Sequence, residues 1–500
     1  MSASAGAVSW LDWGNAPFSL ARAEQKPILL LLGPAWSHAT QRALKETYAD
    51  AGVAACLGER FVPVRVDVDR RPDVGERYTI GGWPTTAFLS AGGGLLGGGV
   101  YVEAAALVEV MERVSEAYAT RREELDDVPM AAPAPAAPIA DPPGAAFEWL
   151  ESTLISTFDH EWGGFGDLPR RFHADALEAV LLGRQVGGSE AADLVEQTLD
   201  LVVGGALWDR IEGGYFRCSE HRDWTAPHVE KLLGLNARLL SLLLTAAERF
   251  DRADCGERAA DLVRFIHQTF ADAQGGFFSS QVANPGYAAL DSLELRLSQA
   301  APALDRTVQT DASAAMASAY VHGARVLRDD SLLEFAATTV DQVVMETYQR
   351  GGGVGHVSAP ASSVRGLLTD QVSASEASLD LFEACGQEAY LDIPRELMAY
   401  CEHTMWTPEG FCDRAQRGLV DENASFGLLS EPHHPLALNC RAAVVLMRLA
   451  DLTGESDYAD EAHRTLASQS GQYRAHGIDG AVYPLAELRI ARTKGAEPPG

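Results

Sequence analysis

A glycine turn followed by an aromatic residue recurs through the last two thirds of the chain. Six degenerate copies of this turn occur at residues 162–165, 212–215, 274–277, 350–353, 409–411 and 479–483. The fourth copy lacks the aromatic residue. Successive copies are separated by roughly 50 to 80 residues, which is enough for two helices of ordinary length and their loops. Six such units predict a ring of six helical hairpins.

The segments between these turns are rich in leucine and alanine. Residues 232–247 and 312–327 are apolar on nearly every side, as expected for helices packed between two layers. An open helical solenoid is the alternative, because the same period could produce it. A closed ring is favoured, since the units are longer and less regular than common solenoid repeats. From residue 147 onward we therefore expect an all-α double ring.

The first part of the chain has a different pattern. Apolar or alternating stretches predict strands at residues 27–32, 61–68 and 85–89. Helical spacing is found at residues 10–25, 42–57 and 103–120. Strands that alternate with helices predict a small α/β domain.

An alanine- and proline-rich stretch separates the two patterns. Proline lacks a backbone N–H donor, so alternating alanine and proline favour an extended spacer. We therefore predict an α/β domain at residues 1–125, a linker at residues 126–146 and the helical ring at residues 147–490.

The charge of the chain narrows the classes of partner. Acidic residues outnumber basic ones 70 to 40, for a formal charge of -30. Such an excess repels phosphate backbones and anionic lipid surfaces, so we expect no nucleic-acid partner and no membrane association. The N-terminus lacks the pattern of a secretory signal, and no apolar run approaches the roughly 20 residues that span a bilayer. These features predict an acidic protein of the cytoplasm.

Seven cysteines are scattered along the chain without a C-x-x-C pair. Their odd number and their spacing predict neither a disulfide framework nor a zinc knuckle. The adjacent His433 and His434 also lack the spacing of two ligands on one helix. We therefore predict no metal site and no cofactor.

Six motifs together resemble a known family. They are K-P-I-L-L-L-L-G at residues 26–33, F-V-P-V-R-V-D-V-D-R-R-P-D-V at 61–74, G-G-W-P-T-T-A-F-L at 81–89, W-D-R-I-E-G-G-Y-F-R at 208–217, D-W-T-A-P-H-V-E-K-L-L at 223–233 and L-M-R-L-A-D-L-T-G at 446–454. Their order resembles the thioredoxin-domain family typified by spermatogenesis-associated protein 20. The resemblance implies a thioredoxin-like domain followed by a six-hairpin α/α toroid akin to sugar epimerases and glycosidases.

The first turn departs from the pattern of this family. Relatives usually carry C-H-W-C-H there, whereas residues 34–38 of this chain read P-A-W-S-H. Disulfide exchange needs a thiolate, so the chain is not expected to be a thiol–disulfide oxidoreductase. The degenerate redox turn comprises Trp36, Ser37, His38 and Pro84.

We interpret this turn as a structural cap of the domain. Trp36 is expected to pack beside Trp83 and Pro84, and the family fold implies a cis peptide before this proline. The alternative is a cleft that still binds an extended peptide or a partner loop without redox chemistry.

The best candidate site lies between residues 209 and 231. Histidine titrates near neutral pH and can move a proton, whereas arginine can hold a carboxylate or orient a hydroxyl. Pro227 suits the first turn of a helix, which would place His228 and Lys231 on one face. In epimerase-like toroids His and Glu act as acid and base on a sugar, so the resemblance implies catalytic roles for His228, Asp209 and Glu230. The alternative is a satisfied polar network that ties a loop to a helix.

Further residues complete the expected binding site. The substrate-binding candidates are Arg217, Trp224, Lys231, Trp162, Tyr215 and His434. Aromatic rings can stack on sugar faces, although rings at loop bases are more often packing anchors. Asp311 and Asp370 stand near the starts of later helices, where a carboxylate can act as an N-cap.

Two functions remain open at this point. The first is a cytoplasmic isomerase, epimerase or hydrolase of carbohydrates, which acts by acid–base chemistry on a sugar or related polar small molecule in the toroid cavity. The second is a non-catalytic scaffold or regulatory protein, whose redox-dead thioredoxin module binds a protein partner. Family positions eroded at residues 234–235, 312–313 and 369–371 favour the second function.

Overall fold

The computed structural model describes residues 8–126, 138, 141–183, 189–358, 364–416 and 426–493. The chain divides into two compact units. One contains Met1–Ala134 together with Leu419–His433, and the other contains Pro135–Gly418 together with His434–Gly500. Most of the predicted linker, namely residues 127–137 and 139–140, lies outside the described residues. Within the described part of the chain, no helix is long and apolar enough to cross a membrane.

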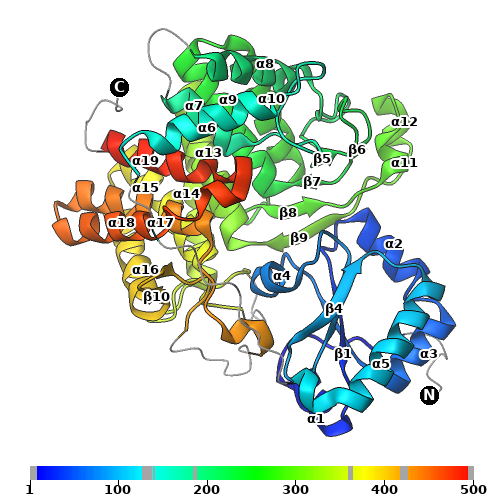
Figure 1. Ribbon diagram of the computed structural model, residues 1–500. Helices are drawn as coiled ribbons and strands as arrows, with labels where there is room; N and C mark the ends of the chain where they lie inside the picture. Colours follow the sequence, from blue (N-terminus) through cyan, green and yellow to red (C-terminus); the bar gives the residue numbers. More distant parts are fainter. Residues whose placement is uncertain are drawn as a thin grey trace. The chain divides into compact units, whose positions relative to one another are not determined.

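A four-stranded sheet forms the centre of the N-terminal unit (Figure 1). Its strands are β1 (Ile28–Leu32), β2 (Val62–Val66), β3 (Thr85–Leu89) and β4 (Leu95–Val100), in the order β2-β1-β3-β4. β2 is parallel to β1, whereas β3 is antiparallel to both of its neighbours. The predicted strands are therefore present, and the thioredoxin-like α/β class is confirmed.

Helices cover both faces of this sheet. They are α1 (Asn15–Glu24), α2 (His38–Glu46), α3 (Ala51–Arg60), α4 (Pro72–Tyr78) and α5 (Ala104–Asp126). Alternate residues of β1 point to opposite faces: Leu30 packs with residues of α1 and α4, whereas Leu29 packs with residues of α3 and α5. The single helix predicted at residues 42–57 is in fact two helices, because the Asp50 side chain accepts the N–H groups of Gly52 and Val53 and begins a new one.

A distant segment completes the core of the N-terminal unit. The short helix η2 (Gly427–Ser430) inserts Leu429, which is buried among residues of α1 and α4. Phe426 stacks on Phe18 with ring centroids 4.7 Å apart. The Tyr78 hydroxyl accepts the N–H of Leu428 at 2.8 Å and donates to the carbonyl of Gly93 at 2.7 Å. The predicted toroid range of 147–490 includes this segment, whereas the structure groups it with the α/β unit.

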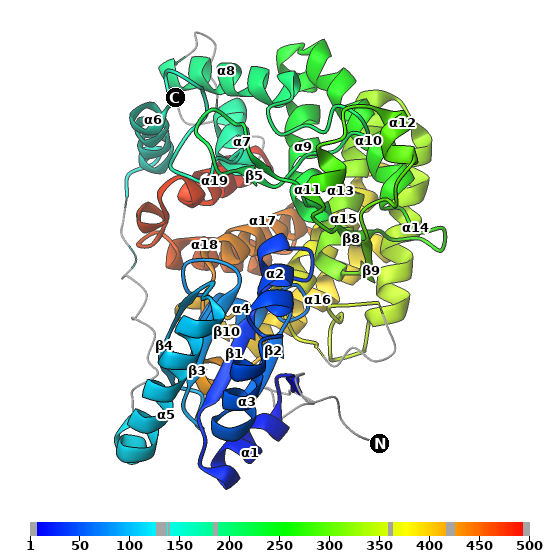
Figure 2. The same ribbon diagram turned by 90° about the vertical axis from the view of Figure 1, so that its right-hand side faces the viewer.

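The second unit is a closed double ring of helices (Figures 1 and 2). The inner helices are α7 (Ala174–Gly183), α9 (Leu233–Phe250), α13 (Thr310–Leu327), α15 (Leu368–Cys385), α17 (Leu436–Thr453) and α19 (Val482–Thr493). The outer helices are α6 (Ala145–Thr157), α8 (Glu190–Gly204), α10 (Ala253–Thr269), α14 (Asp330–Thr347), α16 (Ala389–Met405) and α18 (Ser456–Ser468). Each inner helix contacts the next, and α19 contacts α7. The predicted six-hairpin toroid is therefore confirmed, and the open solenoid is wrong.

The recurring glycine turns link each outer helix to the next inner helix. In four of them the aromatic residue is fully buried, namely Phe165, Tyr215, Phe277 and Phe411. The fourth residue of the following inner helix often binds the backbone of the turn. The Asn236 amide, for example, accepts the N–H of Tyr215 and donates to its carbonyl.

The same device recurs around the ring. Asn439 bonds both backbone groups of Phe411, and Gln371 bonds both backbone groups of Val354. A side-chain amide suits this position because it offers a donor and an acceptor together. Each of these inner helices is thereby fixed in register with the turn that precedes it.

Candidate functional site

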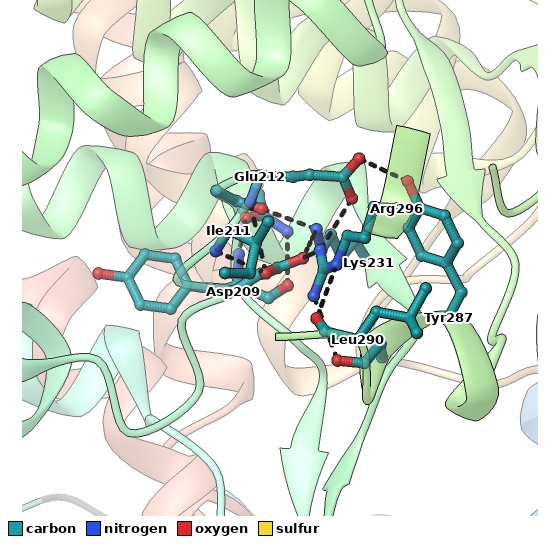
Figure 3. A network of polar contacts seen from close by, with 11 residues as sticks. Asp209, Ile211, Glu212, Lys231, Tyr287, Leu290 and Arg296 are labelled. Atoms are coloured by element: carbon teal, nitrogen blue, oxygen red, sulfur yellow. Dashed lines mark hydrogen bonds and ion pairs between the residues drawn. The ribbon is translucent and has the colours of Figure 1, made fainter. Parts of the chain in front are cut away.

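Two cations enclose the carboxylate of Asp209 (Figure 3). Its Oδ2 accepts from Lys231 Nζ at 2.7 Å and from Arg296 Nη1 at 2.6 Å. Its Oδ1 accepts the N–H groups of Ile211 and Glu212. All three charged side chains are buried, since Asp209 is 4% exposed, Arg296 2% and Lys231 1%.

A segment between β8 (Phe278–Gln281) and β9 (Leu304–Val308) closes this network. It contains α11 (Pro285–Ala288) and α12 (Leu293–Leu297), which carry Tyr287 and Arg296. Arg296 also pairs with Glu212 Oε2 at 2.9 Å, and the Tyr287 hydroxyl donates to Glu212 Oε1 at 2.7 Å (Figure 3). Two carboxylates therefore face two cations, so the charges in the network balance.

The surroundings of Asp209 keep it ionised. Burial alone would raise its pKa, but the charge of Lys231 and the hydrogen bond from Arg296 outweigh burial and lower the pKa below its ordinary value. Burial also lowers the pKa of Lys231, against the attraction of Asp209. A carboxylate held as an ion pair by two cations is a poor proton donor.

His228 belongs to a second, more open network. Its Nδ1 accepts from Arg217 Nη2 at 3.0 Å, and its Nε2 lies 2.7 Å from Glu220 Oε1. Arg217 also donates through Nε to Glu230 Oε1. The His228 side chain is 32% exposed and that of Glu220 66%, whereas Glu230 is buried. The imidazole therefore lies between solvent and an ion pair of the partly exposed Arg217 with the buried Glu230.

The expected helix around His228 is wrong. Pro227–His228 forms strand β6, which pairs with β5 (Cys218–Ser219), and α9 begins only at Leu233. Extended backbone sends successive side chains to opposite sides, so Glu230 joins the His228 network whereas Lys231 joins Asp209. His228 and Lys231 thus do not share the face of a helix.

The predicted aromatic binding residues differ in their exposure to solvent. Tyr215 is fully buried, and its hydroxyl donates to the carbonyl of Val202. The buried Trp224 stacks on Phe172 and donates its indole N–H to the carbonyl of Trp162, whose own side chain is exposed. Of these aromatic side chains, only Trp162 offers a ring to solvent.

His434 lies in a different part of the toroid. Its Nε2 is 2.8 Å from Thr407 Oγ1 and 3.6 Å from Cys412 Sγ, just before α17. It lies beside the hairpin of β10 (Trp406–Thr407) and β11 (Gly410–Phe411). His228, by contrast, lies in the segment that precedes α9.

The degenerate redox turn makes structural contacts within the N-terminal unit. The Ser37 hydroxyl accepts the N–H of Thr40 and caps α2, of which His38 is the first residue. Trp36 packs edge-to-face on Trp83 with centroids 5.8 Å apart, as expected, and donates its indole N–H to Asp69 at 2.5 Å. The peptide between Trp83 and Pro84 is cis. The serine of this turn therefore serves as a helix cap.

A third cluster of polar side chains, which the sequence does not predict, lies near the starts of α13 and α15. Asp311, His356 and Asp370 place one ligand atom each within 4.8 Å of one another. His356 Nδ1 lies 2.8 Å from Asp370 Oδ1, and both residues are buried. Asp311 was expected as an N-cap, but it lies in the first turn of α13, whose N-cap is Gln309. His356 stands in a loop with no local motif around it, so only the closure of the ring could reveal it.

Comparison with known proteins gives a family match for the N-terminal region. Residues 1–132 match the family Thioredox_DsbH, described as a protein of unknown function, DUF255. Spermatogenesis-associated protein 20 of Mus musculus is 26% identical over 315 residues, which cover 55% of this chain and 39% of that protein. The match thus spans about two fifths of the length of this relative.

Solved structures match the toroid. A sugar epimerase from a ruminal bacterium has a TM-score of 0.53 at 11% identity, covering 70% of this chain and 96% of that one. Cellobiose 2-epimerase from Spirochaeta thermophila has a TM-score of 0.54 at 14% identity, covering 70% and 95%. Identities this low establish a likeness of fold. The comparisons therefore confirm the resemblance predicted from the motifs: the chain is similar to spermatogenesis-associated protein 20, with a thioredoxin-like N-terminal region and a toroid of the sugar-epimerase type.

Proposed function

We propose that the toroid binds a sugar or a related polyhydroxylated small molecule and acts on it by acid–base chemistry, as a carbohydrate isomerase, epimerase or hydrolase. The observation that carries this proposal is the His228 network, which places a half-buried imidazole between a fixed guanidinium and solvent. The likeness of the toroid to sugar epimerases supports the class of ligand.

The roles within this network follow from its bonds. Because the Arg217 guanidinium can only donate, His228 Nδ1 accepts, and the imidazole carries its proton on Nε2. Nε2 faces Glu220, whose exposed carboxylate a ligand hydroxyl could displace. In this scheme His228 transfers the proton, Arg217 holds the ring, and the buried Glu230 positions Arg217. We assign Asp209 a structural role instead of proton transfer, since two cations hold it.

Ligand binding by the full-length protein tests the proposal. Thermal unfolding is measured with a panel of mono- and disaccharides that includes cellobiose, for wild type, His228→Gln and the control His221→Gln. His221 lies in the same hairpin loop, and its Nδ1 lies 3.1 Å from Thr225 Oγ1. A ligand should raise the melting temperature of wild type and of His221→Gln but not of His228→Gln. The proposal fails if no sugar shifts the wild type, or if His228→Gln responds as the wild type does.

A non-catalytic binding protein is the second candidate. It is favoured by the closed Asp209 network and by Ser37, which caps a helix instead of supplying a thiol. The protein partner expected for the N-terminal domain belongs to this candidate, and the half-exposed Trp83 is the side chain to replace in a binding assay. Proton NMR of a bound sugar in D₂O separates the two candidates. An isomerase or epimerase incorporates deuterium at a sugar carbon and a hydrolase releases a new reducing end, whereas a binding protein does neither.

The cellular location is part of the same proposal. The acidic chain, with a formal charge of -30, suits the cytoplasm predicted from the sequence. Fractionation of cells that produce the full-length protein would test it, and recovery in the membrane pellet would contradict it.

A further inference from the structure

We propose that Asp311, His356 and Asp370 bind a divalent metal ion. Their three candidate ligand atoms lie within 4.8 Å of one another. They are one nitrogen and two carboxylate oxygens, a donor set common to zinc, iron and manganese sites. The proposal does not depend on sugar binding, because it concerns a different set of residues from the His228 network.

The ring itself brings the three residues together. Asp311 lies in the first turn of α13 and Asp370 in the first turn of α15, and these two inner helices are neighbours. His356 lies in the loop between α14 and α15. The three side chains thus come from three separate segments of the chain and meet at one place.

The backbone of His356 is held in place on both sides. Its carbonyl accepts the N–H of Thr310, the first residue of α13, at 2.9 Å, and its N–H donates to the carbonyl of Val364 at 3.1 Å. The Thr310 hydroxyl donates to the carbonyl of the adjacent Gly355. The imidazole is therefore anchored to the helix that carries Asp311, so little ordering is needed before a metal binds.

The charge of the cluster favours a cation. Two carboxylates face one imidazole, so the three groups together carry a net negative charge whether or not the imidazole is protonated. His356 and Asp370 are both buried, and burying carboxylates close together is costly unless a cation compensates. The Asp209 network meets this requirement with Lys231 and Arg296.

Arg441, on the inner helix α17, is already engaged by other side chains. Burial lowers the pKa of Arg441, but the charge and hydrogen bond of Glu376, followed by the charges of Asp175 and Asp311, outweigh burial and raise it. The guanidinium of Arg441 donates to Glu376 and Ser373. Thr369 supplies a neutral donor to Asp311 Oδ2 at 3.3 Å. A metal ion would add positive charge to a cluster whose own ligands are two carboxylates and one imidazole.

The donor set narrows the identity of the ion. Imidazole suits zinc and iron, and carboxylates also suit manganese, whereas magnesium and calcium prefer oxygen ligands throughout. Metal–ligand bonds of about 2.0–2.2 Å hold their ligand atoms roughly 3 Å apart. His356 Nδ1 and Asp370 Oδ1 already lie 2.8 Å apart, so mainly the Asp311 oxygen would have to move closer. Three protein ligands would leave positions open for water or for a substrate oxygen.

Metal titration of the full-length protein tests the inference. The protein is treated with a chelator and dialysed, and Zn²⁺ is titrated by calorimetry while Mn²⁺ is followed by electron paramagnetic resonance. The wild type should bind one equivalent of either ion. Asp311→Asn should weaken binding at least tenfold, since even the loss of an outer partner of a metal ligand typically costs 10–100-fold.

Asp175→Asn is the matched control. Asp175 also lies half-buried in the first turn of an inner helix, α7, and pairs with Arg238. Its replacement should leave metal affinity unchanged. Asp311 is chosen over the fully buried Asp370 so that the variant folds, which circular dichroism verifies. The inference is overturned if the wild type binds no stoichiometric metal, or if Asp311→Asn and Asp175→Asn bind equally well.

Discussion

The Asp209 network and the His228 network arise from one stretch of sequence, yet they differ in charge and in access to water. Asp209 and Glu212 are matched by Lys231 and Arg296 beneath α11 and α12. His228 instead joins the buried Glu230 to the exposed Glu220. The neighbours Glu230 and Lys231 belong to different networks. Both networks contain carboxylates and an arginine. What distinguishes a structural ion cluster from a site open to a ligand is therefore whether its charges balance and whether solvent reaches it.

The largest effect should come from breaking the closed network with Asp209→Asn. This change leaves Lys231 and Arg296 buried with only Glu212 as a counter-ion, and removing one partner from a buried ion pair costs about 3–5 kcal/mol. Urea unfolding followed by far-ultraviolet circular dichroism measures the loss. Asp223→Asn, in the same stretch, is the control and should have a much smaller effect, because this partly exposed carboxylate accepts neutral hydrogen bonds from the N–H and hydroxyl of Thr225. Equal losses in the two variants would contradict the distinction.

Acid pH should remove the difference in stability between wild type and Asp209→Asn. The pKa of Asp209 lies below its ordinary value of 3.8, so folding favours the carboxylate. Its contribution is complete above the pKa of the unfolded chain and is lost as the pH falls through the lower folded pKa. The stability of wild type should therefore approach that of Asp209→Asn below roughly pH 4. Melting temperatures of both proteins at neutral and acid pH test this, and a constant gap would refute it.

A smaller effect is expected from Arg217→Met. The variant leaves the buried Glu230 without its guanidinium, and a buried group that loses its partner costs about 1–3 kcal/mol. The cost is lower than for Asp209 because Arg217 is partly exposed and water can take its place. Arg210→Met, at an exposed position nearby, is the control for urea unfolding. A loss as large as that of Asp209→Asn would show that both networks are closed.

The smallest effect is expected from Glu220→Gln. Glu220 is mostly exposed, and exposed ion pairs contribute below about 1 kcal/mol. Its unfolding midpoint in urea should stay near that of wild type, while sugar binding at His228 responds. Strong destabilisation would mean that Glu220 holds the hairpin together and that the network is structural.

The repeating part of the fold could be predicted from the sequence. The number of hairpins follows from the glycine turns, since one turn precedes each inner helix. Buried aromatic residues such as Phe165, Tyr215 and Phe277 anchor these turns in the core, which explains why the pattern recurs. Helix ends were harder to predict. The break between α2 and α3 depends on the side chain of Asp50, and the strand at His228 depends on pairing with Cys218. Both are decided by contacts that helical periodicity does not contain.

The candidate site was harder to predict for the same reason. Arg296 and Asp209 are 87 positions apart in the sequence, and no motif near either residue predicts that they form an ion pair. His356 likewise meets Asp311 and Asp370 only after neighbouring hairpins close. The sequence pointed to a polar stretch around Asp209 and His228, but it could not show how that stretch divides.

The segment around η2 has a consequence for how the protein is made. Residues 8–126 leave the ribosome long before residues 426–433, which supply Leu429 and Phe426 to the core around Phe18. Until then the nascent α/β unit exposes an unfilled apolar surface, to which chaperones can bind. Complete maturation of the beginning of this polypeptide therefore waits for translation of most of its remainder.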